Sequence, residues 1–363
     1  MTRFHSSTST TTAEAITAQQ TTKVRSATQI QELVQKRVDE RHSWAPEPPF
    51  RETLPGFLKF MRQQWFEFQP PTLGEFQKEF PIQTLNWEAL QNPPPDAIQL
   101  TWLGHASVLI QLHGWNILCD PVLSDRCSPS QWFGPKRYQP APCSIAELAS
   151  QIDLDLILIS HNHYDHLDYA SVQELASNTN AAFCVPLGLR EWFHKHVSKN
   201  LVIYEQDWHE TCDLDKPHAT SQLSITAVPM KHWSNRTGDK DKTLWCGYAI
   251  QVGSQKVLFP GDTAWFDGLA QVGERYGPFQ VAAIPIGAYE PREFMKTSHV
   301  DPEEAVRMKD AVQAKHALPI HWGTFPLTTE PVFEPREKLL ELMKDRDDKD
   351  TFVPWLIGET RQF

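Results

Sequence analysis

Residues 157–168 read ILISHNHYDHLD, an apolar run that passes directly into three histidines and an aspartate. A short run of β-branched and leucine residues indicates a buried strand. Alternate side chains of an extended segment point the same way, so His161 and His163 can face one point. Asp165 and His166 follow on the turn and can face a second point nearby. Imidazole and carboxylate are the ligands that zinc and similar divalent ions prefer, so the stretch predicts a metal-binding loop after a strand.

Four donors in one loop are too few to close two metal sites, which predicts further ligands elsewhere in the chain. His232 follows the apolar run ITAVPMK, Asp262 follows KVLFPG, and His321 follows ALPI. Pro260 stops the strand before Asp262, and Gly261 permits a tight backbone turn. A carboxylate has two oxygens, so Asp262 can bridge two ions. The sequence therefore predicts one centre assembled from four separate segments.

Composition divides the chain into three parts. Residues 1–42 are expected to be disordered or weakly helical, and their Thr- and Ser-rich start favours a disordered tail over the alternative of a mitochondrial targeting segment. Residues 43–97 form an extension rich in Pro and aromatic residues, and its stretch from Leu54 to Phe68 has apolar residues at helical spacing. That stripe either packs on the core or contacts lipid acyl chains. Over residues 98–363 predicted strands and helices alternate, as expected for one catalytic domain.

The bulk composition argues against some partners and compartments. A formal net charge of −11 over 363 residues disfavours an extended nucleic-acid-binding face. The six cysteines are scattered and no secretory signal follows Met1, so they are expected to be reduced thiols of an intracellular protein. Pairing of Cys127 with Cys143 is the less favoured alternative. No run reaches the roughly 18 apolar residues of a spanning helix, which predicts at most peripheral membrane association.

The spacing HxHxDH in residues 161–166 resembles the signature of the metallo-β-lactamase superfamily. The resemblance implies an α+β fold, a four-layer αββα sandwich that carries an N-terminal extension and holds two metal ions at one edge. The implied ligands are His161, His163 and His232 for the first Zn²⁺, Asp165, His166 and His321 for the second, and Asp262 with a hydroxide between them. Because these ligand types do not select one metal, iron and manganese remain alternatives to zinc.

Longer blocks resemble a narrower family. TWLGHASVLIQ (101–111), CSPSQWFGPKRY (127–138) and IHWGTFPLTTE (320–330) closely resemble the N-acyl-phosphatidylethanolamine-hydrolysing phospholipases D, and the resemblance runs from about residue 95 to the end. It implies a membrane phospholipid substrate, attack of the bridging hydroxide on phosphorus, and N-acylethanolamine and phosphatidic acid as products. It also implies peripheral membrane association and suggests a homodimer.

The resemblance also assigns residues to catalysis and substrate binding. His299 joins Asp165 and Asp262 in the implied catalytic set, since it can donate a hydrogen bond to a developing oxyanion or to the leaving group. The alternative role of His299 is to cap the helix that follows it. Tyr164 and His299 are implied to line the substrate phosphate. Asn235, an implied substrate contact, stands where the family often carries Lys, so its interaction with the headgroup departs from the family pattern.

Four further polar residues have two interpretations each. His105, in WLGHAS, either orients a metal ligand from behind or forms a buried polar bridge between strands. Lys136, Arg137 and Arg236 either meet anionic headgroups or are ordinary solvated charges, and the second interpretation is preferred.

Two other kinds of function fit part of these observations. Another hydrolase of the same fold, such as a lactonase or a tRNA 3′-processing ribonuclease, would use the same metal ligands, because a fold alone does not choose the substrate. A lipid-binding scaffold that merely retains metal is the alternative outside catalysis. The acidic balance disfavours an RNA substrate, and the complete ligand set disfavours the scaffold.

Overall fold

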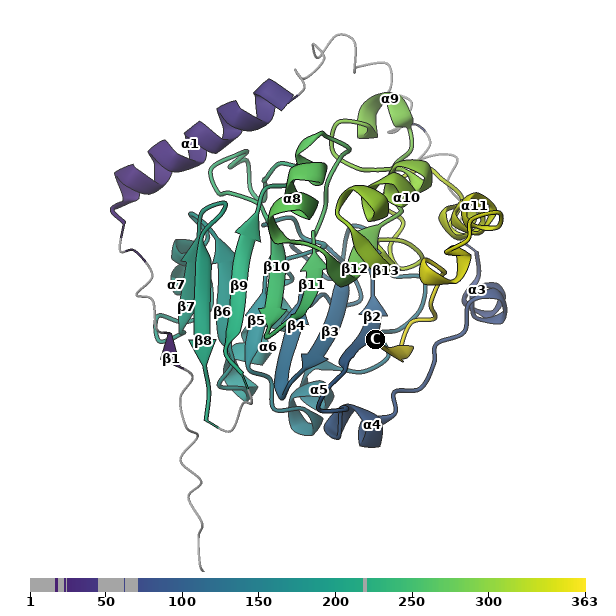
Figure 1. Ribbon diagram of the computed structural model, residues 1–363, viewed down its shortest axis with the longest axis horizontal. Coiled ribbons are helices and arrows are strands. Elements are labelled where there is room, and N and C mark those ends of the chain that lie inside the picture. The colour runs from purple at the N-terminus through teal and green to yellow at the C-terminus, as the bar shows by residue number, and fades with distance from the viewer. Residues whose placement is uncertain (1–16, 19–22, 24, 45–61, 63–70, 218–220) are drawn as a thin grey trace, which may run out of the picture.

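Two seven-stranded sheets form the body of the protein in the computed structural model (Figure 1), which describes residues 17–18, 23, 25–44, 62, 71–217 and 221–363. Sheet A has the order β1 (Thr17–Ala18), β8 (Thr211–Asp215), β9 (Leu223–Val228), β10 (Gly247–Val252), β11 (Gln255–Phe259), β12 (Phe279–Pro285) and β13 (Ala314–Ile320). Sheet B has the order β14 (Thr360–Gln362), β2 (Ile98–Gly104), β3 (Ser107–Leu112), β4 (Trp115–Cys119), β5 (Leu156–Leu158), β6 (Ala182–Pro186) and β7 (Ile203–Gln206).

Helices cover the outer face of each sheet. Sheet A is covered by α8 (Gly268–Tyr276), α10 (Pro302–Ala311) and α11 (Glu334–Met343), and sheet B by α5 (Ile145–Gln151), α6 (Tyr169–Asn178) and α7 (Arg190–His196). The other helices of the described residues are α1 (Ala27–Trp44), α3 (Leu73–Glu79), α4 (Trp87–Gln91), α9 (Arg292–Met295) and the 3₁₀ turn η2 (Lys349–Thr351).

The strands of sheet B send alternate side chains into two different apolar clusters. In β5, Leu156 and Leu158 belong to the cluster that lies between the sheets, where Tyr248 of β10 also packs. The neighbouring Ile157 and Ile159 pack instead with the helices on the outer face. Both faces of this sheet are therefore buried, which explains why its parallel strands read as continuous apolar runs. The layers follow the order αββα, so the predicted fold class is confirmed.

Residues 27–44, most of which belong to the part expected to be disordered or weakly helical, form helix α1. Val34 and Val38 lie one helical turn apart and are buried against the core between the sheets. Arg37 fixes the helix from the same side, because its Nε and Nη2 donate to the two carboxylate oxygens of Asp207 at 2.8 and 3.0 Å. Of the two alternatives, the helical one holds for residues 27–44. The sequence favoured neither because a mostly polar helix shows only a narrow apolar stripe, which becomes evident once its partner surface exists.

The described part of the extension, residues 71–97, packs on the core. Phe76 and Phe80 of the α3 region are fully buried, and the Phe80 ring lies 4.9 Å from that of Trp322, which follows β13. The apolar stripe from Leu54 to Phe68 lies outside the described residues, so its two interpretations stay predictions, as does the targeting role of the first residues.

Two further predictions from composition can be compared with the structure. All six cysteines are buried with free thiols, Cys127 and Cys143 included, which confirms the expectation of reduced cysteines. In the part of the chain that the structure describes, no helix is long and apolar enough to cross a bilayer.

Candidate metal centre

The loop that follows β5 is held in place by Asp120, the residue directly after β4. Strands β4 and β5 are parallel neighbours, so their carboxyl ends meet at one edge of sheet B. The buried carboxylate of Asp120 accepts hydrogen bonds from the Ser160 backbone N–H at 2.7 Å, the Ser160 hydroxyl at 2.5 Å and His166 Nδ1 at 2.7 Å. His161 Nδ1 lies 2.9 Å from the Ser160 Oγ. Sequence reasoning missed Asp120, although an acidic residue directly after the apolar run ILC was a usable signal.

These hydrogen bonds decide which nitrogens face the centre. A histidine whose Nδ1–H is donated to an acceptor keeps the lone pair on Nε2 for a metal. His161 and His166 donate in this way toward Ser160 and Asp120, and His232 Nδ1 donates to the Ser298 carbonyl at 3.0 Å. Three imidazoles are thereby oriented as Nε2 ligands.

All seven predicted ligands meet at the edge where these strands end. Two histidines, His105 and His299, join them. The groups whose donor atoms lie within 4.8 Å of one another are His105, Asp165, His166 and His321; His161, His163 and His232; His161, His166 and Asp262; and His232, Asp262 and His299. Apart from His163 and Asp165, which are partly exposed, every member is buried.

Asp262 occupies the middle of the centre. Its Oδ2 atom lies 3.1 Å from His166 Nε2, 3.2 Å from His321 Nε2, 3.8 Å from His232 Nε2 and 3.8 Å from His299 Nδ1. On one side, His163 Nδ1 is 2.8 Å from His161 Nε2 and 3.2 Å from His232 Nε2. On the other side, His321 Nε2 is 3.3 Å from Asp165 Oδ2. A carboxylate between two such sets has the position of a bridging ligand.

Gly261 explains how Asp262 reaches the loop after β5. Its φ is +62°, in the left-handed region that favours glycine. A Cβ atom at this position would lie 2.4 Å from the Cβ of Ser160, so only glycine lets the two segments approach this closely. The tight turn predicted at Gly261 is present, and it brings the two sheets together at the centre.

The donor set fits a divalent metal ion. The buried atoms His166 Nε2, His321 Nε2 and Asp262 Oδ1 have no hydrogen-bond partner among the described residues, although the two nitrogens lie close to carboxylate oxygens. Buried polar atoms are nearly always satisfied, so atoms like these call for another partner. Imidazole nitrogens and carboxylate oxygens converging in a closed site are what zinc and related ions bind.

The charges of the site point the same way. Burial lowers the pKa of His163 to about 4 and, with the neighbouring imidazoles of His166 and His163, holds the pKa of His161 below its usual value. Burial acts to raise the pKa of Asp262, but His166 and His321 outweigh it and lower that pKa. Burial also opposes protonation of His321, yet Asp262 and Asp165 raise its pKa to about 9. The ionised carboxylates thus demand positive charge, which a metal ion would supply.

His105 lies behind the ligand Asp165. Its Nε2 is 3.0 Å from Asp165 Oδ2, and its backbone N–H donates to Thr324 Oγ1 at 2.7 Å. Burial lowers the pKa of His105 to about 3, so it is neutral at pH 7 and can donate one N–H to the carboxylate. Of the two interpretations from sequence, the geometry supports the one in which His105 orients a ligand.

The predicted substrate residues lie at different distances from the centre. His299 belongs to it, and the loop that carries it is held by Arg292, whose Nη1 donates to the His299 carbonyl at 2.8 Å. Tyr164 sits on the metal loop, with the Arg236 guanidinium 4.1 Å from its ring centre. Asn235 is partly buried, and its side-chain oxygen has no partner within the described residues.

Two basic residues expected to be solvated charges are structural instead. Arg236 donates from Nη1 to the Leu167 carbonyl at 2.7 Å and the Asn162 carbonyl at 3.1 Å, so it clamps both ends of the metal loop. Arg137 is 6% exposed and donates from Nη2 to the Val122 carbonyl at 3.0 Å. Both predictions were wrong because a guanidinium can satisfy carbonyls that no strand partner reaches.

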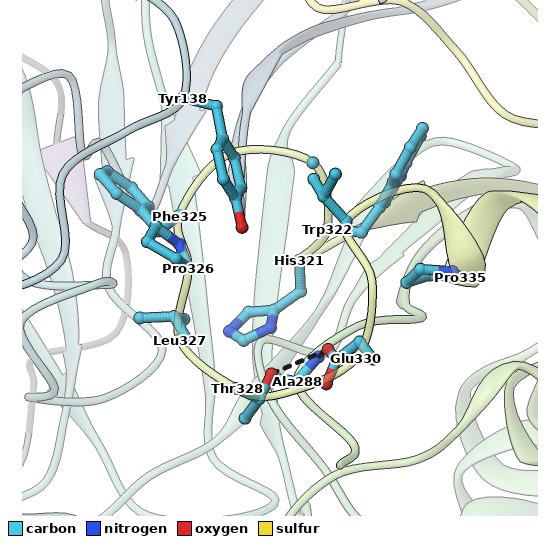
Figure 2. A pocket seen from close by; sticks show the side chains of 12 residues that line it. Tyr138, Ala288, His321, Trp322, Phe325, Pro326, Leu327, Thr328, Glu330 and Pro335 are labelled. Atoms are coloured by element: carbon cyan, nitrogen blue, oxygen red, sulfur yellow. Dashed lines mark hydrogen bonds between the residues drawn. The ribbon is translucent and has the colours of Figure 1, made fainter. Parts of the chain in front are cut away.

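A small pocket of about 20 Å³ lies beside His321 (Figure 2). Figure 2 shows the His321 ring with Tyr138 on one side and Thr328 and Glu330 on the other. The Glu330 carboxylate accepts hydrogen bonds from the Thr328 hydroxyl at 2.8 Å and from the Ala288 backbone N–H at 2.6 Å. Glu330, which sequence reasoning missed, therefore fixes the segment that packs next to this ligand.

Comparisons with known proteins place this chain among related sequences. A family model described as a beta-lactamase superfamily domain covers residues 115–322. N-acyl-phosphatidylethanolamine-hydrolyzing phospholipase D 1 of Caenorhabditis elegans is 43% identical over 268 residues, 71% of this chain and 74% of that protein. The mitochondrial N-acyl-phosphatidylethanolamine-hydrolyzing phospholipase D of Saccharomyces cerevisiae is 33% identical over 72% of this chain, which spans only 55% of that protein.

A solved structure agrees at the level of the fold. Igni18, a metallo hydrolase from Ignicoccus hospitalis, has a TM-score of 0.55 and 22% identity, and the match covers 74% of this chain and 98% of that one. Fold and centre together define this chain as a metal-dependent hydrolase of the metallo-β-lactamase superfamily. Within that superfamily, it belongs to the N-acyl-phosphatidylethanolamine-hydrolysing phospholipase D family. The family predicted from the sequence blocks is therefore confirmed.

Proposed function

We propose that this chain hydrolyses N-acyl-phosphatidylethanolamine to N-acylethanolamine and phosphatidic acid. One observation carries the proposal: the carboxylate of Asp262 stands between two sets of buried ligands, in a chain 43% identical to a protein named for this reaction. Two cations held about a shared carboxylate suit phosphoester hydrolysis, because charge develops on both the attacking and the leaving oxygen.

We propose two Zn²⁺ ions as the cofactor. His161, His163 and His232 would hold one ion, Asp165, His166 and His321 the other, and Asp262 both. A bound divalent ion would stabilise negative charge on a phosphoryl oxygen and make water a competent nucleophile at neutral pH.

His299 is the residue of the chain best placed to handle a proton. It is 8% exposed, and its Nδ1 lies 3.8 Å from Asp262 Oδ2 with no hydrogen-bond partner among the described residues. Burial lowers its pKa to about 4, so the ring is neutral at pH 7 and carries one N–H that it can donate. The departing ethanolamine oxygen needs such a donor, whereas Tyr164 and Asn235 are assigned to substrate binding.

The direct test is product identification. Purified, metal-analysed protein is incubated with vesicles of N-acyl-phosphatidylethanolamine, with a lactone panel and with a precursor tRNA, and the products are identified by mass spectrometry. The expected outcome is N-acylethanolamine and phosphatidic acid from the lipid alone, and no product from the Asp262→Asn variant. Turnover of a lactone or of tRNA in place of the lipid would overturn the proposal. Binding of the lipid without turnover by the metal-replete wild type would favour the scaffold.

The reaction sets expectations for partners and place. The substrate is a membrane lipid, so peripheral membrane association inside the cell is part of the proposal, and the family suggests a homodimer. The S. cerevisiae relative is named as mitochondrial. The mitochondrion is therefore the compartment to test first, with the Thr- and Ser-rich start of this chain as the proposed targeting segment. Imaging of the full chain and of a variant lacking residues 1–25, with a carboxyl-terminal fluorescent tag, decides it.

A further inference from the structure

The loop between β4 and α5 presents two bare aromatic side chains at its tip. The tip, residues 127–135, reads CSPSQWFGP and has no charged side chain. Trp132 is 85% exposed and Phe133 is 75% exposed, the two highest values among the large apolar residues that the structure describes. A large aromatic pair left in water at the end of an uncharged loop is a costly arrangement, which points to a surface that covers it.

We infer that this tip inserts into the surface of a lipid bilayer and docks the centre on its substrate; the inference rests on the proposed lipid substrate. Trp and Phe are side chains that settle at membrane interfaces, where the ring enters the acyl boundary and the indole N–H stays near the headgroups. Two cationic residues, Arg126 and Lys136, stand on either side of the tip and pair with each other as an antiparallel bridge.

Part of the backbone of the tip is hydrogen-bonded within the loop. The Trp132 N–H donates to Ser130 Oγ at 3.2 Å, the Ser130 N–H to Ser128 Oγ at 3.4 Å and the Cys127 N–H to the Pro135 carbonyl at 3.3 Å. Arg126 closes the loop by donating to the Gly134 carbonyl. Each of these hydrogen bonds leaves one backbone group fewer to lose its water when the tip enters a bilayer.

A tight turn gives the tip its shape. Gly134 has a φ of +89°, and a Cβ atom there would lie 2.7 Å from the Cβ of Ser128. The two arms of the loop therefore touch just beside Phe133. Trp132 and Phe133 therefore lie on a closed turn and not on an extended segment.

The base of the same loop contacts two segments that carry metal ligands. Ser124 donates from its hydroxyl to Asp168 Oδ2 at 2.6 Å, two residues beyond the ligand His166. The Tyr138 N–H donates to the Thr324 carbonyl at 2.9 Å, three residues beyond the ligand His321. The loop that carries the tip therefore packs directly on the segments that carry His166 and His321.

A bilayer is a better occupant of this surface than a second copy of the chain. Two aromatic side chains bury roughly 150–250 Å² each. A stable protein interface needs about 800 Å² from each partner, which a projecting tip of nine residues does not offer by itself. Insertion into lipid has no such area requirement, since every buried methylene contributes separately.

The test measures vesicle binding apart from turnover. The full-length Asp262→Asn protein, which keeps the tip but not the chemistry, is mixed with phosphatidylcholine–phosphatidylethanolamine vesicles, and the bound fraction is measured by flotation. Adding Trp132→Ser and Phe133→Ser is expected to reduce the partition coefficient by roughly tenfold or more, because two apolar rings leave the membrane. Trp132→Phe with Phe133→Leu keeps the apolar character and is expected to restore binding.

The matched control changes exposed leucines on α11, an element that does not belong to the loop. Leu340 and Leu342 of α11 are 47% and 38% exposed, so Leu340→Ser with Leu342→Ser removes comparable apolar surface from another place. Binding by the tip variant equal to that of wild type, or an equal loss in the control, overturns the inference. So does a change in molar mass by light scattering without a change in vesicle binding, which would make the tip a protein contact. If vesicle binding depends on the tip but the wild-type protein turns over no lipid, the proposed function is overturned and the inference about the tip stands.

Discussion

The two halves of the metal centre are built in different ways. The half on sheet B is one continuous loop from Ser160 to His166, held from behind by Asp120 and His105. The half on sheet A is assembled from ends of separate elements, namely the residues after β9, β11 and β13 and the loop before α10. The first half keeps its geometry through side-chain hydrogen bonds within one edge of a sheet, whereas the second depends on the packing of the whole sandwich.

Asp262 is where the two halves share a ligand, so changing it should have the largest effect. Asp262→Asn keeps the shape but removes the charge that draws His166 and His321 together. The expected result is loss of kcat by roughly a thousandfold or more, with bound metal well below that of wild type. Metal analysis by mass spectrometry together with initial rates checks it. Retention of both metals and of activity would mean that the halves do not depend on a shared carboxylate.

Asp120 tests the half on sheet B. In the Asp120→Asn variant, an amide replaces one carboxylate oxygen, so His166 Nδ1 or Ser160 loses its acceptor. Metal affinity or kcat should fall by roughly 10- to 100-fold, the usual loss for a residue that orients a ligand. Ser160→Ala removes only the relay to His161 and should cost less. Competition of the purified variants with a chromophoric chelator measures the affinities, and the reverse order would contradict the assignment.

His105 should matter less, because Asp165 is also approached by His321. His105→Ala removes the hydrogen bond to Asp165 and should lower kcat by about tenfold, with a smaller change in KM. His105→Gln retains a donor at a similar reach and should recover most of the loss. If the two substitutions behave alike, His105 fills space and does not orient the ligand.

The smallest effect is expected far from the centre, at Asp348. Its carboxylate accepts from Arg346 Nε at 2.7 Å and from the buried Lys309 of α10 at 2.6 Å, and these contacts hold the pKa of Asp348 well below its usual value. A depressed folded-state pKa gives stability that is full above the unfolded value of about 3.9 and is lost as the pH falls through the folded value. Asp348→Asn should therefore cost about 1 kcal/mol or less near pH 7, since the pair is partly solvated.

Two measurements separate this effect from any effect on the centre. The difference in the free energy of unfolding between wild type and Asp348→Asn, measured in urea, should shrink between pH 5 and pH 2. Metal content at pH 7 should not change. A loss of metal in this variant would show that α10 transmits strain to His299, and the division between the centre and its surroundings would need revision.

The success of sequence reasoning differed between these regions for physical reasons. Ligands next to one another in the chain, such as His161 and His163, are visible because local geometry alone makes them converge. His232, Asp262 and His321 could be found because each follows an apolar run, and strand ends meet at a sheet edge. Asp120 also follows an apolar run, but its role as the acceptor for Ser160 and His166 becomes evident only when β4 and β5 are known to be neighbours.

Other errors came from residues whose partners are distant in the chain. Arg236 reads as a surface charge until the loop carbonyls of Asn162 and Leu167 are placed around it. Helix α1 reads as a tail until Asp207 supplies the partner for Arg37. The exposure of Trp132 could not be predicted from the sequence either, because an aromatic residue in a loop is more often buried than exposed.

The amino-acid sequence by itself determined the metal-binding loop and the strand-end ligands, because these depend on local periodicity and on the chemistry of residue types, and its longer blocks carried the resemblance that implied the αββα class and the family. Only the tertiary structure decided how closely Asp262 approaches each ligand set, which of its two predicted roles His105 has, that Asp120 orients the loop after β5, and that an uncharged loop leaves two aromatic side chains exposed. Those facts depend on which strands are neighbours and which side chains lose their water, and both are properties of the folded chain as a whole.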